Sequence, residues 1–276
     1  MPYRKIVAAA YDAGVEEEFC RLTSNPLRET EFRLITELMD EYIPGSGTII
    51  DIGSGPGRYA EYLLKRNCRV GLVDLSALSL KAFSERIQDS DLCDKILFNR
   101  VSCATQLDWI DNSSADAILL MGPMYHLVNE DHRNITLTHC RRILKPGGFL
   151  FSVFLSPFPA LFNTQEFSGQ ELLFSNWQLY KHIQESTTTH THFQGFDVPQ
   201  FRCWPQYAWK ILNQSGFKIV RTRNIEGIGS FYPDTHWDKQ MTKDEKESLT
   251  LTLRNSSECI DKLGITHQYI SIARTS

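Results

Sequence analysis

A glycine-rich loop lies between a short apolar run and a helix-like pattern, in the segment Asp51-Ile52-Gly53-Ser54-Gly55-Pro56-Gly57. Glycines at such a junction let the backbone turn tightly and approach a ligand, and the free N–H groups of the following helix attract a carboxylate or a phosphate. A dinucleotide site favours the spacing G-x-G-x-x-G, but Arg58 stands where its third glycine belongs. Asp51 would repel a pyrophosphate and attract an ammonium or sulfonium group. The loop therefore favours a ligand that carries a cation.

A second carboxylate, Asp74, closes the next apolar run along the chain. A carboxylate at this position accepts hydrogen bonds from both hydroxyls of a ribose, so the expected ligand is a nucleoside without a 2′-phosphate. A ribose, a carboxylate and a cation together describe S-adenosylmethionine.

Three further segments follow in the order found in one enzyme family, namely Val73-Asp74-Leu75-Ser76, Asp116–Leu127 and Arg142-Ile143-Leu144-Lys145-Pro146-Gly147-Gly148. With these segments the sequence resembles the class I S-adenosylmethionine-dependent methyltransferases over about residues 28 to 155, and more weakly through the C-terminal strands. The resemblance implies S-adenosylmethionine as the cofactor. It implies cofactor contacts from Asp51, Gly53, Ser54, Gly55, Gly57, Asp74, Leu75, Cys103, Ala104, Met121 and Gly122.

The sequence departs from the family pattern after the third strand. Family members often carry an Asp-Ala pair there, whose carboxylate accepts from the adenine amino group, whereas this chain has Cys103-Ala104. We expect the adenine to rest on the Ala104 backbone N–H and nearby apolar side chains, with Asp108 as an uncertain substitute for the missing carboxylate.

The segment Met121-Gly122-Pro123-Met124-Tyr125-His126-Leu127 resembles a G-P-x-Y-H-L loop of bacterial small-molecule methyltransferases. His126, which titrates near neutrality in its ordinary state, is the first candidate for a general base or substrate anchor. The alternative is that His126 only holds the loop. Tyr125 would orient the substrate or pack over the methionine part of the cofactor. Tyr11, with Asp12, resembles an N-terminal aromatic segment that folds over the cofactor, and otherwise it is an ordinary tyrosine ahead of a helix.

These residues need a scaffold of alternating strands and helices. Apolar runs of strand length occur at Thr48–Ile52, Arg69–Asp74, Ile96–Val101, Ala117–Met121 and Phe149–Leu155, and helix-like patterns at about residues 28 to 43, Arg58–Arg66, Ala77–Ile87 and His132–Leu144. The alternation predicts an α/β fold with a parallel sheet. The resemblance implies a seven-stranded, mostly parallel Rossmann-like sheet flanked by helices, whose last strand is antiparallel. It also implies that Lys145-Pro146-Gly147-Gly148 forms a tight turn leading into the fifth strand.

The alternation ends after Leu155. We expect residues 1–44 to form an N-terminal helical cap, 45–155 the cofactor-binding core, 156–203 a lid or substrate insertion, and 204–276 the rest of the core sheet. Later elements are predicted at Thr187–Phe193 (strand), Pro205–Gln214 (helix), Phe217–Arg223 (strand), Thr242 to about Lys262 (helix, with a capping box, ended by Gly264) and Tyr269–Ala273 (closing strand, beside Phe217–Arg223).

Charge and composition limit the classes of molecule that the protein is expected to bind. Lys plus Arg number 29 and Asp plus Glu 33, for a net charge of −4, so no long-range attraction draws a nucleic acid. The seven cysteines lack a C-x-x-C pair, and His190-Thr191-His192 has no evident third ligand, so no metal is expected. We expect a cytoplasmic protein without membrane contact, a monomer or homodimer, acting on a small molecule. The alternatives are an RNA or protein methyltransferase, a non-catalytic cofactor-binding protein and, less favoured, a nicotinamide-dependent oxidoreductase.

Overall fold

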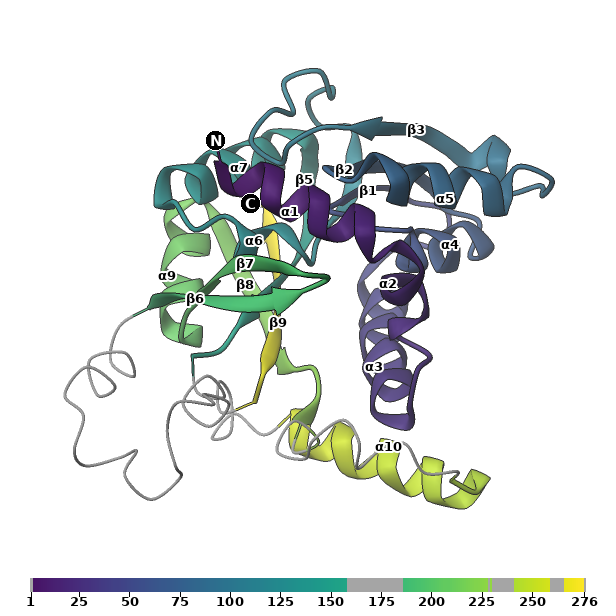
Figure 1. Ribbon diagram of the computed structural model, residues 1–276. Helices are drawn as coiled ribbons and strands as arrows, with labels where there is room; N and C mark the ends of the chain where they lie inside the picture. The colour runs from purple at the N-terminus through teal and green to yellow at the C-terminus, as the bar shows by residue number, and fades with distance from the viewer. Residues whose placement is uncertain (1, 158–185, 228, 230–240, 259–265, 276) are drawn as a thin grey trace, which may run out of the picture.

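The computed structural model describes residues 2–157, 186–227, 229, 241–258 and 266–275, which form a mixed α/β fold around one sheet (Figure 1). Its helices are α1 (Pro2–Ala13), α2 (Val15–Arg21), α3 (Pro26–Tyr42), α4 (Arg58–Lys65), α5 (Ala77–Ile87), the 3₁₀ helix η1 (Cys93–Lys95), α6 (Pro123–His126), α7 (Glu130–Ile143), α9 (Pro205–Gln214) and α10 (Lys243–Ser257). Its strands are β1 (Thr48–Ile52), β2 (Arg69–Asp74), β3 (Ile96–Val101), β4 (Ala115–Leu120), β5 (Leu144–Leu155), β6 (Thr187–Phe193), β7 (Phe196–Arg202), β8 (Phe217–Asn224) and β9 (Gln268–Thr275).

The sheet is covered on both faces because its central strands are apolar at successive positions. Ile50 and Ile118 face one hydrophobic core, which α7 and α9 complete, whereas Ile49 and Leu119 face a second core with α3, α4 and α5. Strands buried on both faces in this way are typical of parallel sheets with crossover helices. The predicted fold class is confirmed.

Strands β3, β2, β1, β4 and β5 lie side by side in that order and run parallel. Strand β9 is inserted between β5 and β8 and runs antiparallel to both, as predicted for the closing strand. The described residues add two strands to the expected seven, because β6 and β7 form an antiparallel hairpin that meets β5 at the pair Leu155–Arg202. The sequence pattern predicts β6 but not β7.

The segment Lys145-Pro146-Gly147-Gly148 does not precede the fifth strand as a separate turn. It lies inside β5, where Leu144 pairs with Ala115 and Phe149 pairs with Ala117. Four residues of β5 thus lie opposite the single residue Asp116, and the extra residues form an irregularity that the positive φ of Gly147 accommodates. Lys145 Nζ contacts Asp116 Oδ1 at 2.7 Å across this bulge.

The N-terminal region consists of helices, as expected. In Figure 1, α1 crosses in front of the sheet and leads into α2, which lies beside α3. Tyr11 lies ahead of the long helix α3, as predicted, and belongs to a helix of its own, α1. Thr242 forms the predicted capping box with Glu245 at the start of α10. The predicted end of that helix, near Lys262 and Gly264, lies outside the described residues.

The predicted insertion at 156–203 is described only in part. Residues 158–185 lie outside the described residues, and the C-terminal part of the insertion is the β6–β7 hairpin. None of the helices in the described ranges combines the length and apolar character needed to span a bilayer.

Candidate active site

A cavity lies at the carboxyl ends of β1, β2, β3 and β4, and α1 and α2 form its opposite wall. Its volume, counted out to its open mouth, is about 1090 Å³. The predicted site residues that line it are Tyr11, Asp51, Gly53, Ser54, Gly55, Asp74, Leu75, Cys103, Ala104, Met121, Gly122, Tyr125 and His126. Ligands of open α/β sheets bind at this edge, so the cavity is where the fold class places a site.

Two of the loop glycines serve different purposes. Gly55 has a φ of +53°, and a Cβ on it would find only Glu18 Cγ, 3.9 Å away, so its backbone is open to the cavity. Gly57 does not line the cavity. It precedes α4 with a φ of +81°, and a Cβ there would lie 2.2 Å from Phe83 Cδ2. The predicted cofactor residue Gly57 is therefore a packing residue between α4 and α5.

The two predicted carboxylates lie at the ends of adjacent strands. Asp74 Oδ2 accepts from the Gly55 N–H at 2.7 Å, and Asp74 Oδ1 accepts from the Ser76 N–H at 2.8 Å. Burial raises the pKa of Asp74 while these backbone bonds oppose the shift. Asp74 thus fixes the shape of the glycine loop and still presents lone pairs to the cavity.

Asp51 is 3% exposed, and no residue in the described part of the chain donates a hydrogen bond to it. Burial, and then the charge of Asp74, raises the pKa of Asp51 to about 8. A cation beside a buried carboxyl without a partner stabilises the ionised form of that carboxyl. The residues present therefore fit a ligand with an ammonium group at this end of the cavity.

The other end of the cavity is lined by Leu75, Ser102, Cys103 and Ala104. Asp108 is exposed and does not line the cavity, so it does not replace the carboxylate that the family often carries here. An apolar surface with backbone N–H groups is consistent with a flat, uncharged base.

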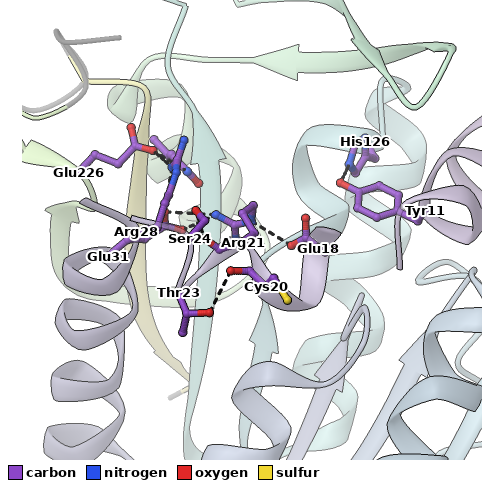
Figure 2. A network of polar contacts seen from close by, with 11 residues as sticks. Tyr11, Glu18, Cys20, Arg21, Thr23, Ser24, Arg28, Glu31, His126 and Glu226 are labelled. Atoms are coloured by element: carbon purple, nitrogen blue, oxygen red, sulfur yellow. Dashed lines mark hydrogen bonds and ion pairs between the residues drawn. The ribbon is translucent and has the colours of Figure 1, made fainter. Parts of the chain in front are cut away.

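Three aromatic residues meet on the β4 side. Tyr11 Oη lies 3.0 Å from His126 Nε2, and the two rings meet edge to face at 5.5 Å between centroids (Figure 2). The Tyr125 ring lies 4.7 Å from the ring of His126. Burial raises the pKa of both tyrosines. The structure thus brings together the three predicted catalytic residues from α1 and α6.

His126 does not have the titration expected from its type. It is 9% exposed, and burial lowers its pKa to about 4, although a contact with the Pro199 backbone carbonyl opposes the shift. The expectation that His126 titrates near neutrality is therefore wrong, because the sequence does not show that α1 covers the ring. A neutral imidazole accepts a hydrogen bond from Tyr11 when Nε2 is unprotonated.

Sequence reasoning missed most of the wall formed by the N-terminal helices and by the start of α4. The missed lining residues with polar side chains are Tyr3, Arg4, Glu18, Arg21, Arg58, Tyr59 and Ser102. The sequence does contain a helical spacing in this region. Val7 and Tyr11 are four residues apart, and Glu18 and Arg21 are three residues apart, which places each pair on one face of a helix. Without a known docking surface, that spacing does not say what the face covers.

No group of three or more His, Cys, Asp or Glu side chains within the described ranges is arranged to hold a metal ion. His190 Nδ1 instead contacts Asp197 Oδ2 at 2.8 Å across the β6–β7 hairpin.

Residues 49–148 match the family model described as a methyltransferase domain. A search of curated protein sequences found no match. Among solved structures, a Burkholderia thailandensis 1,6-didemethyltoxoflavin-N1-methyltransferase, with bound 1,6-didemethyltoxoflavin and S-adenosylhomocysteine, is 15% identical, with a TM-score of 0.56 and coverage of 100% of this chain and 89% of that one.

Two archaeal structures are similar. A Haloferax volcanii putative methyltransferase, in complex with the Trm112 methyltransferase activator, is 15% identical with a TM-score of 0.59, over 96% of this chain and 97% of that one. An S-adenosylmethionine-dependent methyltransferase from Methanosarcina mazei is 14% identical with a TM-score of 0.55, over 86% and 96%. At these identities the structures show the fold alone. Residues 49–148 thus match a methyltransferase domain, within a fold that S-adenosylmethionine-dependent methyltransferases share.

Proposed function

We propose that the enzyme methylates a small molecule that binds beside Tyr11, Tyr125 and His126. The observation that carries this proposal is the position of α1 and α2, which close the cavity opposite the sheet. An acceptor must then fit beside the cofactor between the sheet and these helices, which suits a metabolite better than a polymer. The small-molecule enzyme from Burkholderia thailandensis shares this fold.

We assign the cofactor to the floor of the cavity. Asp74 would accept hydrogen bonds from the ribose, Asp51 would hold the ammonium group, and the backbone of Gly53, Ser54 and Gly55 would accommodate the amino-acid part. Leu75, Cys103 and Ala104 would hold the base, and Met121 and Gly122 the region of the sulfur. When bound, the cofactor would supply a methyl group on its sulfonium sulfur. The methyl group would pass to the acceptor, and the sulfur would leave as part of a neutral thioether. In-line displacement needs orientation and a dry site more than it needs acid or base groups.

The aromatic group supplies that orientation. Because His126 is neutral, it holds the Tyr11 hydroxyl in place, and the oxygen of that hydroxyl keeps a lone pair for a proton or a polar group of the acceptor. A histidine with a pKa of about 4 is a weak base at neutral pH. We therefore favour a positioning role for His126, with Tyr11 and Tyr125 in contact with the acceptor.

For the domains we propose the division expected from the sequence. Residues 1–44 cover the site, 45–155 and 204–276 share one sheet, and 156–203 form an insertion on the acceptor side. The β6–β7 hairpin supports this last placement. Phe193, the last residue of β6, packs against Tyr11 with 5.4 Å between ring centroids, and Tyr11 lies where we place the acceptor.

Two measurements test the proposal. Calorimetry should show binding of S-adenosylmethionine and S-adenosylhomocysteine but not of NAD. A screen of small metabolites, read out as release of S-adenosylhomocysteine, should find an acceptor. Gly55→Val provides the inactive control. Cofactor binding without turnover on any metabolite, together with turnover on RNA or protein, would refute the small-molecule assignment. Since the Haloferax volcanii neighbour was crystallised with an activator protein, each screen should be repeated with cell extract added.

A further inference from the structure

Four polar side chains of α1 contact residues that follow the carboxyl ends of β2, β3 and β4. They are Tyr3 (to His132), Arg4 (to Thr105), Tyr11 (to His126) and Asp12 (to Ser76 and Leu78). The first three line the cavity, whereas Asp12 does not. The shape of the cavity wall therefore does not explain Asp12, and its role has to come from its own contacts.

Asp12 binds the first turn of α5. Its Oδ1 accepts from the Leu78 backbone N–H at 3.2 Å and from Ser76 Oγ at 2.6 Å. Ser76 is the N-cap of α5, and its side chain accepts from the Ser79 N–H at 3.0 Å. A carboxylate at a helix N-terminus is stabilised by the unpaired N–H groups and by the helix dipole. The C-terminal end of α1 is thus fastened to the start of α5.

Ser76 also connects Asp12 to the glycine loop. Its N–H donates to Asp74 Oδ1 at 2.8 Å, and Asp74 Oδ2 accepts from the Gly55 N–H at 2.7 Å. Ser76 is fully buried, and its one hydroxyl hydrogen points to Asp12, because an ionised carboxylate only accepts. A continuous chain of hydrogen bonds therefore runs from Asp12 through Ser76 and Asp74 to Gly55.

Apolar contacts follow the same path. Leu75, between Asp74 and Ser76, packs against a small cluster that includes Val7 and Ala10 of α1, and Tyr11 packs against the same cluster. Val7, Tyr11 and Leu75 all line the cavity. A molecule bound on Asp74 and Leu75 is thus enclosed by the segment that holds α1 and by α1 itself.

Asp12 and Tyr11 are consecutive in α1, so their side chains leave the helix about 100° apart. One reaches α5, and the other reaches α6, where Tyr11 Oη lies 3.0 Å from His126 Nε2 (Figure 2). The bond of Asp12 to α5 therefore sets the rotation of α1 about its axis. That rotation in turn sets the direction of Tyr11.

We propose that Asp12 is a positioning residue that couples cofactor binding at Asp74 to the placement of Tyr11 beside the acceptor. This inference rests on the proposed placement of the cofactor. Coupling between two sites acts in both directions, so docking of α1 strengthens cofactor binding, and cofactor binding stabilises α1. The cofactor then binds before the acceptor and completes the acceptor site.

Hydrogen exchange of residues 2–13, measured with and without saturating S-adenosylhomocysteine, tests the coupling. In the wild type the ligand should slow exchange at least about fivefold, the low end for coupled sites. In Asp12→Ala the slowing should fall below about twofold, and calorimetry should show affinity for S-adenosylhomocysteine about fivefold weaker. Asp12→Asn keeps an oxygen that accepts from Ser76 and Leu78, so it should restore most of both effects.

The NMR resonances of the His126 ring report the position of Tyr11 directly. In Asp12→Ala they should move towards their positions in Tyr11→Phe, whereas in Asp12→Asn they should stay near those of the wild type. Lys5→Ala, which removes a charge from an exposed position of the same helix, is the matched control and should behave as the wild type in every measurement. Melting temperatures without ligand show whether each variant folds.

The outcomes separate this inference from the proposed function. If the ligand leaves exchange in α1 unchanged in the wild type, or if Asp12→Ala keeps the wild-type affinity, the coupling is refuted while the cofactor site stands. If Asp12→Ala speeds exchange by the same factor with and without ligand, Asp12 only holds the helix, and the coupling is again refuted. If the wild type does not bind S-adenosylhomocysteine, the cofactor placement fails and this inference fails with it.

Discussion

Asp74 connects the loop to its ligand, because it accepts from the Gly55 and Ser76 N–H groups and lines the cavity. Asp74→Asn keeps the size of the side chain, but it replaces with an NH₂ group one of the two oxygens that accept from the Gly55 and Ser76 N–H groups. We expect it to weaken S-adenosylhomocysteine binding by ~1.5–3 kcal/mol, the range for hydrogen bonds to charged groups. Calorimetry measures this, with the exposed Asp89→Asn as the control. Unchanged affinity would place the ribose elsewhere.

Asp51 makes cofactor binding depend on pH. Burial, and then Asp74, raises its pKa to about 8, so the free protein carries a proton on Asp51 at pH 6 to 7. An ammonium group beside it favours the ionised form, so binding should release that proton and affinity should rise as the pH rises towards about 8. Calorimetry in two buffers of different ionisation enthalpy should give a release near one proton. Asp51→Asn should abolish it, and an equal release in that variant would contradict the assignment.

His126 should stay neutral through the physiological range. Burial lowers its pKa to about 4, so its ring resonances in an NMR titration should not shift between pH 8 and pH 5. Tyr11→Phe removes the 3.0 Å contact to Nε2 and should change the position of these resonances. An inflection near pH 6.5 in the wild type would show that α1 does not bury the ring.

At the scale of elements, the turn from β1 into α4 depends on two glycines in different ways. Gly55→Val should abolish S-adenosylhomocysteine binding, because its side chain would enter the cavity, while the melting temperature falls only moderately. Gly57→Ala should lower the melting temperature more, because its Cβ would lie 2.2 Å from Phe83 Cδ2 at a φ of +81°. Thermal unfolding and calorimetry on both variants distinguish the two effects, and a reversed pattern would contradict them.

The elements that the sequence predicted best are those whose apolar pattern is set by burial. The bounds of β1, β2, β3 and α5 agree with the predicted ranges, because each is apolar where it faces a core. Strand β7 was missed because Phe196–Arg202 contains Pro199, although the two-residue turn Gln194-Gly195 that joins it to β6 is typical of a hairpin. The segment from Lys145 to Gly148 was placed before β5, because a bulge and a turn share the same glycines.

The site residues also fall into those that the sequence predicts and those that it does not. Asp51, Asp74 and the glycine loop could be predicted because motif spacing positions them at strand ends. Glu18 and Arg21 could not, because their place in the cavity wall depends on how α2 docks across the sheet, and docking is a tertiary property. The low pKa of His126 was hidden for the same reason.

At the scale of the whole molecule, the position of the cavity between the sheet and the helices α1 and α2, and the net charge of −4, argue against a polymer substrate. Bulk tRNA should therefore not bind measurably in fluorescence anisotropy at about 50 mM salt, where electrostatic binding is strong. It should also not compete with S-adenosylhomocysteine. Salt-sensitive binding of the RNA would favour the alternative of an RNA methyltransferase.

Strand β9 lies between β5 and β8, although the chain reaches it long after both. During synthesis, β5 and β8 therefore present unpaired backbone edges until residues 268–275 have left the ribosome. A nascent chain is thus at its most aggregation-prone just before the sheet is complete, and a peptide with the β9 sequence should inhibit folding by occupying the gap between β5 and β8.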